Sequence, residues 1–152
     1  MRIAIAADHG GYPLNETVIA LLEKLGHTVI DHGVHSSEAA DYPDAARAVA
    51  ECMHAGEADR GIVLCGSGVG VTIAVNKFRG IRACLCHDTY SARQGVEHDA
   101  MNVLCLGARI VGVELALELV RAFLGAEFSN EERHVRRSDK VDAIEREQAA
   151  SA

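Results

Sequence analysis

Short apolar runs alternate along the chain with longer segments in which apolar residues recur at helical spacing. The apolar runs predict strands at Ile3–Ala7, Thr28–Asp31, Gly61–Cys65, Arg82–Cys86 and Val103–Gly107. Strands separated by helices are typical of βαβ units, in which the sheet is parallel and helices cover both of its faces. We therefore expect a single-domain α/β protein of the doubly wound, Rossmann-like class with a five-stranded parallel sheet.

The segments between the apolar runs predict helices. Pro13 suits the first turn of the earliest helix and Gly26 suits its end, with apolar residues on one face between them. Further helices are expected at residues 43–56, from 68, from 89, at 113–124 and, more weakly, at 139–148. The chain is thus expected to form one domain over residues 1–148 with a C-terminal helical tail, and residues 149–152 are expected to be frayed.

Composition and charge narrow the class of protein and of ligand. Apolar residues make up 49% of the chain and charged residues 24%, as in ordinary globular domains. A net charge of −7 argues against nucleic acid and anionic membranes as partners, and no apolar run is long enough to span a bilayer. Because the first residues show no complete signal peptide, we expect a cytoplasmic protein. Five scattered cysteines suit reduced thiols better than disulfides.

A glycine-rich loop, Cys65-Gly66-Ser67-Gly68-Val69-Gly70, joins the third predicted strand to a helix. Unpaired N–H groups and the helix dipole favour negative charge at such a junction, which suits an anionic ligand or a thiolate. The loop fits neither the dinucleotide-binding fingerprint nor a Walker loop, and it lacks the arginine of a cysteine phosphatase loop. We expect chemistry on an anionic or enolate-like species, although free cysteines are more often buried as small apolar groups.

Other polar residues follow strands at the edge of the sheet where ligands of doubly wound proteins bind. Asp8-His9-Gly10-Gly11 follows the first strand, His87-Asp88 the fourth and Gly107-Ala108-Arg109 the fifth. We expect them to converge with Cys65, although Asp8 and His9 would also suit a helix cap. Cys84 and Cys86 beside His87 give only a weak indication of zinc, so we expect no metal site.

A basic cluster stands out in the acidic chain, formed by Arg133, His134, Arg136, Arg137 and Lys140. Arginine clamps phosphate in a fork geometry, so this cluster suits a phosphate site as well as a solvated helix face. His98 supplies a group that titrates near neutral pH and could move a proton, the plainer alternative being a surface histidine.

Together these motifs resemble the type B ribose-5-phosphate isomerases of the ribose/galactose isomerase family. The resemblance covers almost the whole chain, in matching order and spacing. It is carried by Asp8-His9-Gly10-Gly11, Asp41-Tyr42-Pro43, the Cys65–Gly70 loop, Asn76-Lys77, Ile81-Arg82-Ala83, Tyr90-Ser91-Ala92-Arg93, His98, Asn102-Val103-Leu104, Gly107-Ala108-Arg109 and Arg133-His134.

The resemblance implies an aldose–ketose isomerase that interconverts ribose 5-phosphate and ribulose 5-phosphate through an enediolate, with neither a metal nor a cofactor. It implies Cys65 as the base, His98 as the ring-opening acid and Ser67 as a proton carrier. It also implies a homodimer, or a tetramer, whose active sites are shared between subunits. The substrate-binding residues that it implies are Asp8, His9, Tyr42, Gly66, Ser67, Gly68, Val69, Gly70, Asp99, Arg109, Arg133 and Arg137.

One position departs from the pattern of the family. Many members have Asn after the catalytic histidine, where this chain has Asp99. An amide can donate to a sugar oxygen, whereas an ionised carboxylate can only accept. The sequence therefore leaves open an isomerase of hexose 6-phosphates, such as those of allose or galactose. A non-catalytic module that binds phosphorylated metabolites is the remaining alternative, and it would need neither Cys65 nor His98.

Overall fold

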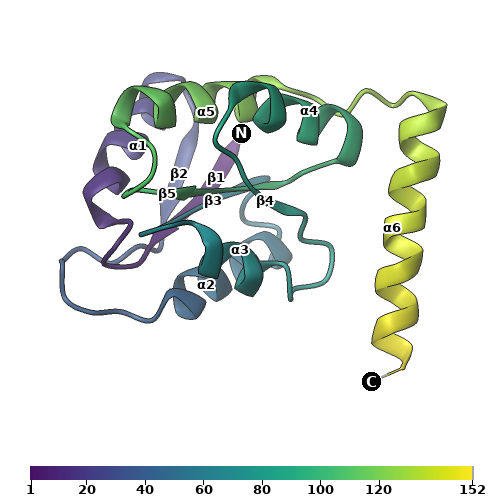
Figure 1. Ribbon diagram of the computed structural model, residues 1–152, viewed down its shortest axis with the longest axis horizontal. Coiled ribbons are helices and arrows are strands. Elements are labelled where there is room, and N and C mark those ends of the chain that lie inside the picture. Colours follow the sequence, from purple (N-terminus) through teal and green to yellow (C-terminus); the bar gives the residue numbers. More distant parts are fainter. Residues whose placement is uncertain (152) are drawn as a thin grey trace.

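The sheet has five parallel strands, as predicted, in the computed structural model, which describes residues 1–151 (Figure 1). Its strand order is β2-β1-β3-β5-β4. The strands are β1 (Arg2–Ala7), β2 (Thr28–Asp31), β3 (Arg60–Cys65), β4 (Ala83–Leu85) and β5 (Val103–Gly107). The edge strand β4 is shorter than predicted and pairs with β5 alone.

Helices cover both faces of this sheet. The apolar sides of α1 (Tyr12–Lys24), α4 (Thr89–Asp99) and α5 (Val113–Gly125) pack on one face. Those of α2 (Tyr42–His54) and α3 (Val69–Val75) pack on the other. Figure 1 shows the two helical layers above and below the strands. The doubly wound α/β class is thus confirmed.

The strand order places a crevice at the carboxyl ends of β1 and β3. From β1 the chain crosses to β2 on one side, and it later returns to β3 on the other side of β1. The helices that follow β1 and β3 lie on opposite faces, so the two loops diverge and leave room between them. Doubly wound proteins bind ligands at this kind of switch point. The loops that begin at Asp8 and Cys65 both lie there.

The last helix is longer than the sequence predicts: α6 runs from Glu132 to Ala150, and its start at residue 139 was wrong. The first turns of α6 contain few apolar residues, so no apolar pattern marks where the helix begins. His134 is the one buried side chain between residues 132 and 150. Figure 1 shows α6 standing to one side of the sheet, next to the end of α4. Residues 149 and 150, expected to be frayed, belong to this helix, and residue 152 lies outside the described residues.

Hydrogen bonds and ion pairs, rather than apolar packing, hold α6 against the rest of the domain. Nη1 of Arg82 donates to the carbonyl oxygen of Asp99 at 3.0 Å and to Oγ of Ser138 at 2.5 Å. The same guanidinium pairs with the carboxylate of Asp142. Farther along the helix, Glu145 accepts from the N–H of Gly80 at 2.8 Å. Arg82 thus ties α6 to the last turn of α4.

Candidate active site

A pocket of about 380 Å³ opens at the carboxyl ends of β1 and β3. It brings together most of the residues that the sequence predicts after the first, third and fifth strands. The lining residues are Asp8, His9, Gly10, Tyr42, Cys65, Gly66, Ser67, Gly70, Arg109 and Ile110. Gly68 and Val69 belong to the same loop without lining the pocket. The convergence expected from the carboxyl-end rule is therefore observed for this group.

The turn after β1 is held by Asp8, which is buried. Its Oδ1 accepts from the N–H groups of Gly10 at 2.8 Å and Gly11 at 2.9 Å, so the carboxylate organises the start of α1. Gly10 lets this turn press against the neighbouring loop, because a Cβ there would come within 2.8 Å of the Gly66 nitrogen. Asp8 thus stabilises the turn before α1, whose N-cap is Gly11 without a side-chain cap, and it lines the pocket as well.

His9 is fixed by the loop that precedes α2. Nδ1 of His9 lies 3.1 Å from the backbone nitrogen of Ala40 and 3.2 Å from its carbonyl oxygen. Among residues 1–151, Nε2 of His9 has no hydrogen-bond partner. His9 is therefore held through Nδ1 in the pocket wall, and its other ring nitrogen is left for a ligand.

Cys65 forms the floor of the pocket. The residue is 5% exposed, and its Sγ accepts from the N–H of Gly68 at 3.0 Å. Among residues 1–151, the N–H groups of Gly66, Ser67 and Gly70 have no protein acceptor. Free donors beside a nucleophile or base make an anion-binding cradle.

The pocket walls come from α2 and from the loop after β5. The Tyr42 ring packs on Gly70, where a Cβ would lie 3.0 Å from Cε2. The Arg109 guanidinium lies over Gly66, where a Cβ would come within 3.5 Å of it. Ile110, which is 58% exposed, lines the pocket beside Arg109, and sequence reasoning missed it. Its place directly after Gly107-Ala108-Arg109 was the available signal.

The second group of predicted site residues lies elsewhere in this chain. α4 begins just after β4 and runs back across the sheet, so His98 and Asp99 in its last turn lie at the opposite edge. There the carbonyl oxygen of Asp99 contacts Arg82, at the start of β4. Arg133 and Arg137 are exposed on α6. A single chain therefore does not assemble the full predicted set.

His98 has two close neighbours at that edge. Nε2 of Gln94 lies 2.9 Å from its Nδ1. The ring of His134, at the start of α6, stacks on it with a centroid distance of 3.9 Å. Nε of nearby Arg133 donates to Glu131 at 2.9 Å. This edge of the molecule thus gathers a histidine pair and the exposed arginines of α6.

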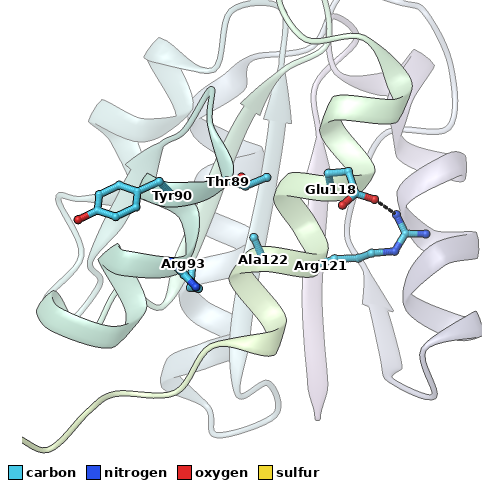
Figure 2. A pocket seen from close by; sticks show the side chains of 6 residues that line it. All are labelled: Thr89, Tyr90, Arg93, Glu118, Arg121 and Ala122. Atoms are coloured by element: carbon cyan, nitrogen blue, oxygen red, sulfur yellow. Dashed lines mark hydrogen bonds and ion pairs between the residues drawn. The ribbon is translucent and has the colours of Figure 1, made fainter.

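A second groove, of about 490 Å³, lies between α4 and α5 (Figure 2). Figure 2 shows Tyr90 and Arg121 pointing to opposite sides of it. Arg121 pairs with Glu118 at 2.8 Å, and Arg93 lies 3.9 Å from Glu97. Each arginine of the groove therefore has a carboxylate close by. The groove holds neither cysteine nor histidine, and its polar groups do not converge. The pocket around Cys65 is the better candidate.

Among residues 1–151, no group of three or more His, Cys, Asp or Glu side chains is placed to hold a metal ion. Nor is any of the described helices both long and apolar enough to cross a membrane.

Comparison with known proteins matches the chain to one family. The sequence model described as Ribose/Galactose Isomerase covers residues 3–141. Ribose-5-phosphate isomerase B of Escherichia coli is 46% identical over 144 residues, which span 95% of this chain and 96% of that protein. D-erythrulose-4-phosphate isomerase of Pectobacterium atrosepticum is 43% identical over 129 residues, 84% of this chain and 85% of that protein.

Solved structures agree with the sequence comparison. Ribose-5-phosphate isomerase B of Clostridium thermocellum superposes with a TM-score of 0.94 at 48% identity. The superposition covers 97% of this chain and 99% of that one. Fold and sequence therefore point to the same relatives over nearly the full length.

Proposed function

The chain belongs to the ribose/galactose isomerase family, and on that premise we propose that it interconverts D-ribose 5-phosphate and D-ribulose 5-phosphate. Sugar-phosphate isomerisation is the activity of the family. The main support for this pair of substrates is the pocket, in which the Cys65 sulfur and free N–H groups lie beside Asp8 and His9.

Cys65 acts as the base in this mechanism. Its thiolate removes the proton from C2 of the open-chain aldose, a double bond forms between C1 and C2, and the carbonyl electrons move to O1. Ser67 carries the O2 proton to O1. The O2 anion then forms the carbonyl at C2, and the electrons of the C1–C2 double bond take the proton of the thiol at C1. The short contact between the Gly68 N–H and Sγ supports this role.

The loop amides stabilise the intermediate. The N–H groups of Gly66, Ser67 and Gly70 have no acceptor within residues 1–151, so they are available to the oxygens of the enediolate. Donors fixed before the reaction need no reorganisation when the charge develops, which is why they lower the barrier. Asp8 orients the sugar hydroxyls from the turn after β1.

His98 donates a proton to the ring oxygen of the closed sugar, and His9, Arg133 and Arg137 hold the phosphate. Arg109 closes the pocket over Gly66. Because His98 and the α6 arginines lie away from Cys65 in one chain, we propose a two-fold dimer in which each site combines residues of both chains. Exposed apolar side chains support pairing. They are Val69 and Ile73 on α3 and Val141 and Ile144 on α6.

A second candidate substrate class is the hexose 6-phosphates. Asp99 favours it, since a carboxylate offers only acceptors where an amide would offer a donor as well. Discrimination between sugars depends on which hydroxyls find partners. The relative named as a D-erythrulose-4-phosphate isomerase adds a tetrose 4-phosphate to the substrates worth testing.

An isomerase assay across phosphorylated tetroses, pentoses and hexoses, with and without a chelator, tests the proposal. We expect the highest kcat/KM with ribose 5-phosphate, unchanged by the chelator. Asp99→Asn should shift the ratio of kcat/KM between pentose and hexose phosphates. Turnover confined to hexose 6-phosphates would favour the second candidate. Tight binding without any turnover would favour a binding module.

A further inference from the structure

His98 lies face to face with a second histidine, His134, which is almost fully buried. The centroids of the His98 and His134 rings are 3.9 Å apart, and their planes are inclined by 25°. His134 is 1% exposed and is the one buried side chain between residues 132 and 150. A polar ring is costly to bury unless it is hydrogen-bonded. Nδ1 of His134 lies 2.6 Å from Oγ of Ser129.

The segment that carries Ser129 is tied to α4. The N–H of Ser129 donates to the carbonyl oxygen of Glu97 at 2.9 Å, one residue before His98. The N–H of Glu131 donates to Oγ of Ser129 at 3.2 Å. Ser129 therefore holds the His134 ring at a fixed position relative to the last turn of α4.

Gln94 fixes the other side of His98. Its Nε2 lies 2.9 Å from Nδ1, and an amide NH₂ donates, so the neutral His98 ring carries its proton on Nε2. Among residues 1–151, no group forms a hydrogen bond with that Nε2. The imidazole is thus held at one nitrogen and across one face, and its protonated nitrogen is left for a ligand.

The environment keeps His134 neutral. Burial lowers its pKa, and the nearby His98 and Arg133 act in the same direction against the opposing carboxylate of Glu131. A neutral His134 ring adds no positive charge beside His98, so the two rings stack without charge repulsion.

We propose that His134 is a positioning residue: held by Ser129, its ring fixes the plane of the His98 imidazole so that Nε2 reaches the ring oxygen of a cyclic sugar phosphate. The inference rests on the proposed function, in which His98 opens the ring. Because His134 is 1% exposed, it acts through His98 and not by its own contact with the sugar.

Two aldose substrates separate this role from a purely structural one. Ribose 5-phosphate is a closed ring in solution. Erythrose 4-phosphate stays open, because the hydroxyl that would close a five-membered ring carries the phosphate. Ring opening is therefore needed only for the pentose. The experiment measures kcat/KM with both aldoses for wild type, His98→Ala, His134→Ala, His134→Leu and His134→Phe.

Loss of the acid should affect turnover of ribose 5-phosphate far more than turnover of erythrose 4-phosphate. We expect His98→Ala to lower kcat/KM with ribose 5-phosphate by about 10²–10⁴-fold, the usual contribution of a general acid. His134→Ala and His134→Leu should show the same asymmetry, with a loss of up to about 10²-fold from misplacement. His134→Phe keeps a flat ring against His98 and should recover most of the activity. Thermal unfolding shows which variants are folded.

Each outcome decides between the claims. If folded His134→Leu lowers kcat/KM equally for both aldoses, or for neither, while His98→Ala keeps the asymmetry, the positioning role is wrong and the role of His98 stands. If His98→Ala shows no asymmetry, the proposed acid is wrong and the inference falls with it. Should His134→Ala fail to fold, His134→Leu decides, because it fills the same volume without a flat ring.

Discussion

The Sγ atom of Cys65 accepts a hydrogen bond at 3.0 Å from the N–H of Gly68, inside the loop that Cys65 begins. Gly68 has a φ of 82°, which turns its amide back towards the end of β3. Most side chains avoid this left-handed conformation, so glycine is the residue that permits it. The bend of the loop and the donor on the sulfur therefore have one origin.

Replacing Cys65 with Ala should abolish turnover and leave binding of sugar phosphates largely intact, since the proposed phosphate ligands lie elsewhere. Steady-state kinetics and calorimetry check both effects. Cys52→Ala, which removes a buried thiol of α2 away from the pocket, is the matched control. A Cys65→Ala variant that keeps more than about a tenth of the wild-type kcat, a loss under ~1.4 kcal/mol, would exclude the cysteine as base.

Gly68→Ala should cost more stability than Gly26→Ala, although both positions have positive φ. At Gly26 (φ 80°) a new Cβ meets nothing within 4 Å, so only backbone strain of about 1–2 kcal/mol is expected. At Gly68 the Cβ would lie 2.4 Å from Leu85 Cδ1 and 3.0 Å from the Leu106 backbone, which adds about 1–3 kcal/mol of overpacking. Urea unfolding measures the difference, and kcat should fall only for Gly68→Ala. Equal losses in stability would contradict this picture of the loop.

Arg133→Ala and Arg137→Ala should each weaken substrate binding by about 1.5–3 kcal/mol, the range for hydrogen bonds to charged groups. The two side chains are one turn apart and share a face of α6. Arg146→Ala is the control and should bind normally, because this exposed arginine lies about two and a half turns beyond Arg137 and hence on the opposite face of α6. Calorimetry with ribose 5-phosphate, and competition by inorganic phosphate, measure the effect. Unchanged affinity in both variants would make this cluster a solvated helix face.

Low pH should destabilise the protein through His134. Burial lowers its folded pKa below the unfolded value of about 6.5, so the unfolded chain binds more protons between the two values. The stabilising contribution is complete above about pH 6.5 and is lost as the pH falls towards the folded pKa. Unfolding free energies measured from about pH 5 to 8 should slope less in His134→Phe than in wild type. Parallel curves for the two proteins would disprove the contribution of this ring.

Sequence reasoning predicted the strands and the pocket around Cys65 well because both depend on local signals. Apolar runs of five or six residues marked β1 and β3, and the polar residues directly after them had to share an edge of a parallel sheet. The start of α6 escaped prediction because Arg82 and Ser138 hold that helix through contacts between distant parts of the chain. No periodic apolar face announces such contacts.

The placement of His98 depended on knowledge that no local pattern contains. Its helix spacing was clear, yet whether it meets Cys65 depends on the length and direction of α4 and, in the proposed dimer, on the partner chain. The stack with His134 was equally hidden, because the sequence presented His134 as one member of a charge cluster. Burial distinguishes it from the arginines beside it.

Complementation between two inactive variants tests most directly whether Cys65 of one chain works with His98 and the α6 arginines of another. Cys65→Ala and His98→Ala chains are unfolded, mixed in equal amounts and refolded. Random pairing gives about half heterodimers, each with one intact and one doubly damaged site. Activity should then return to roughly a quarter of the wild-type value. Heterodimers that form, as native mass spectrometry would show, and yet remain inactive would contradict the shared site.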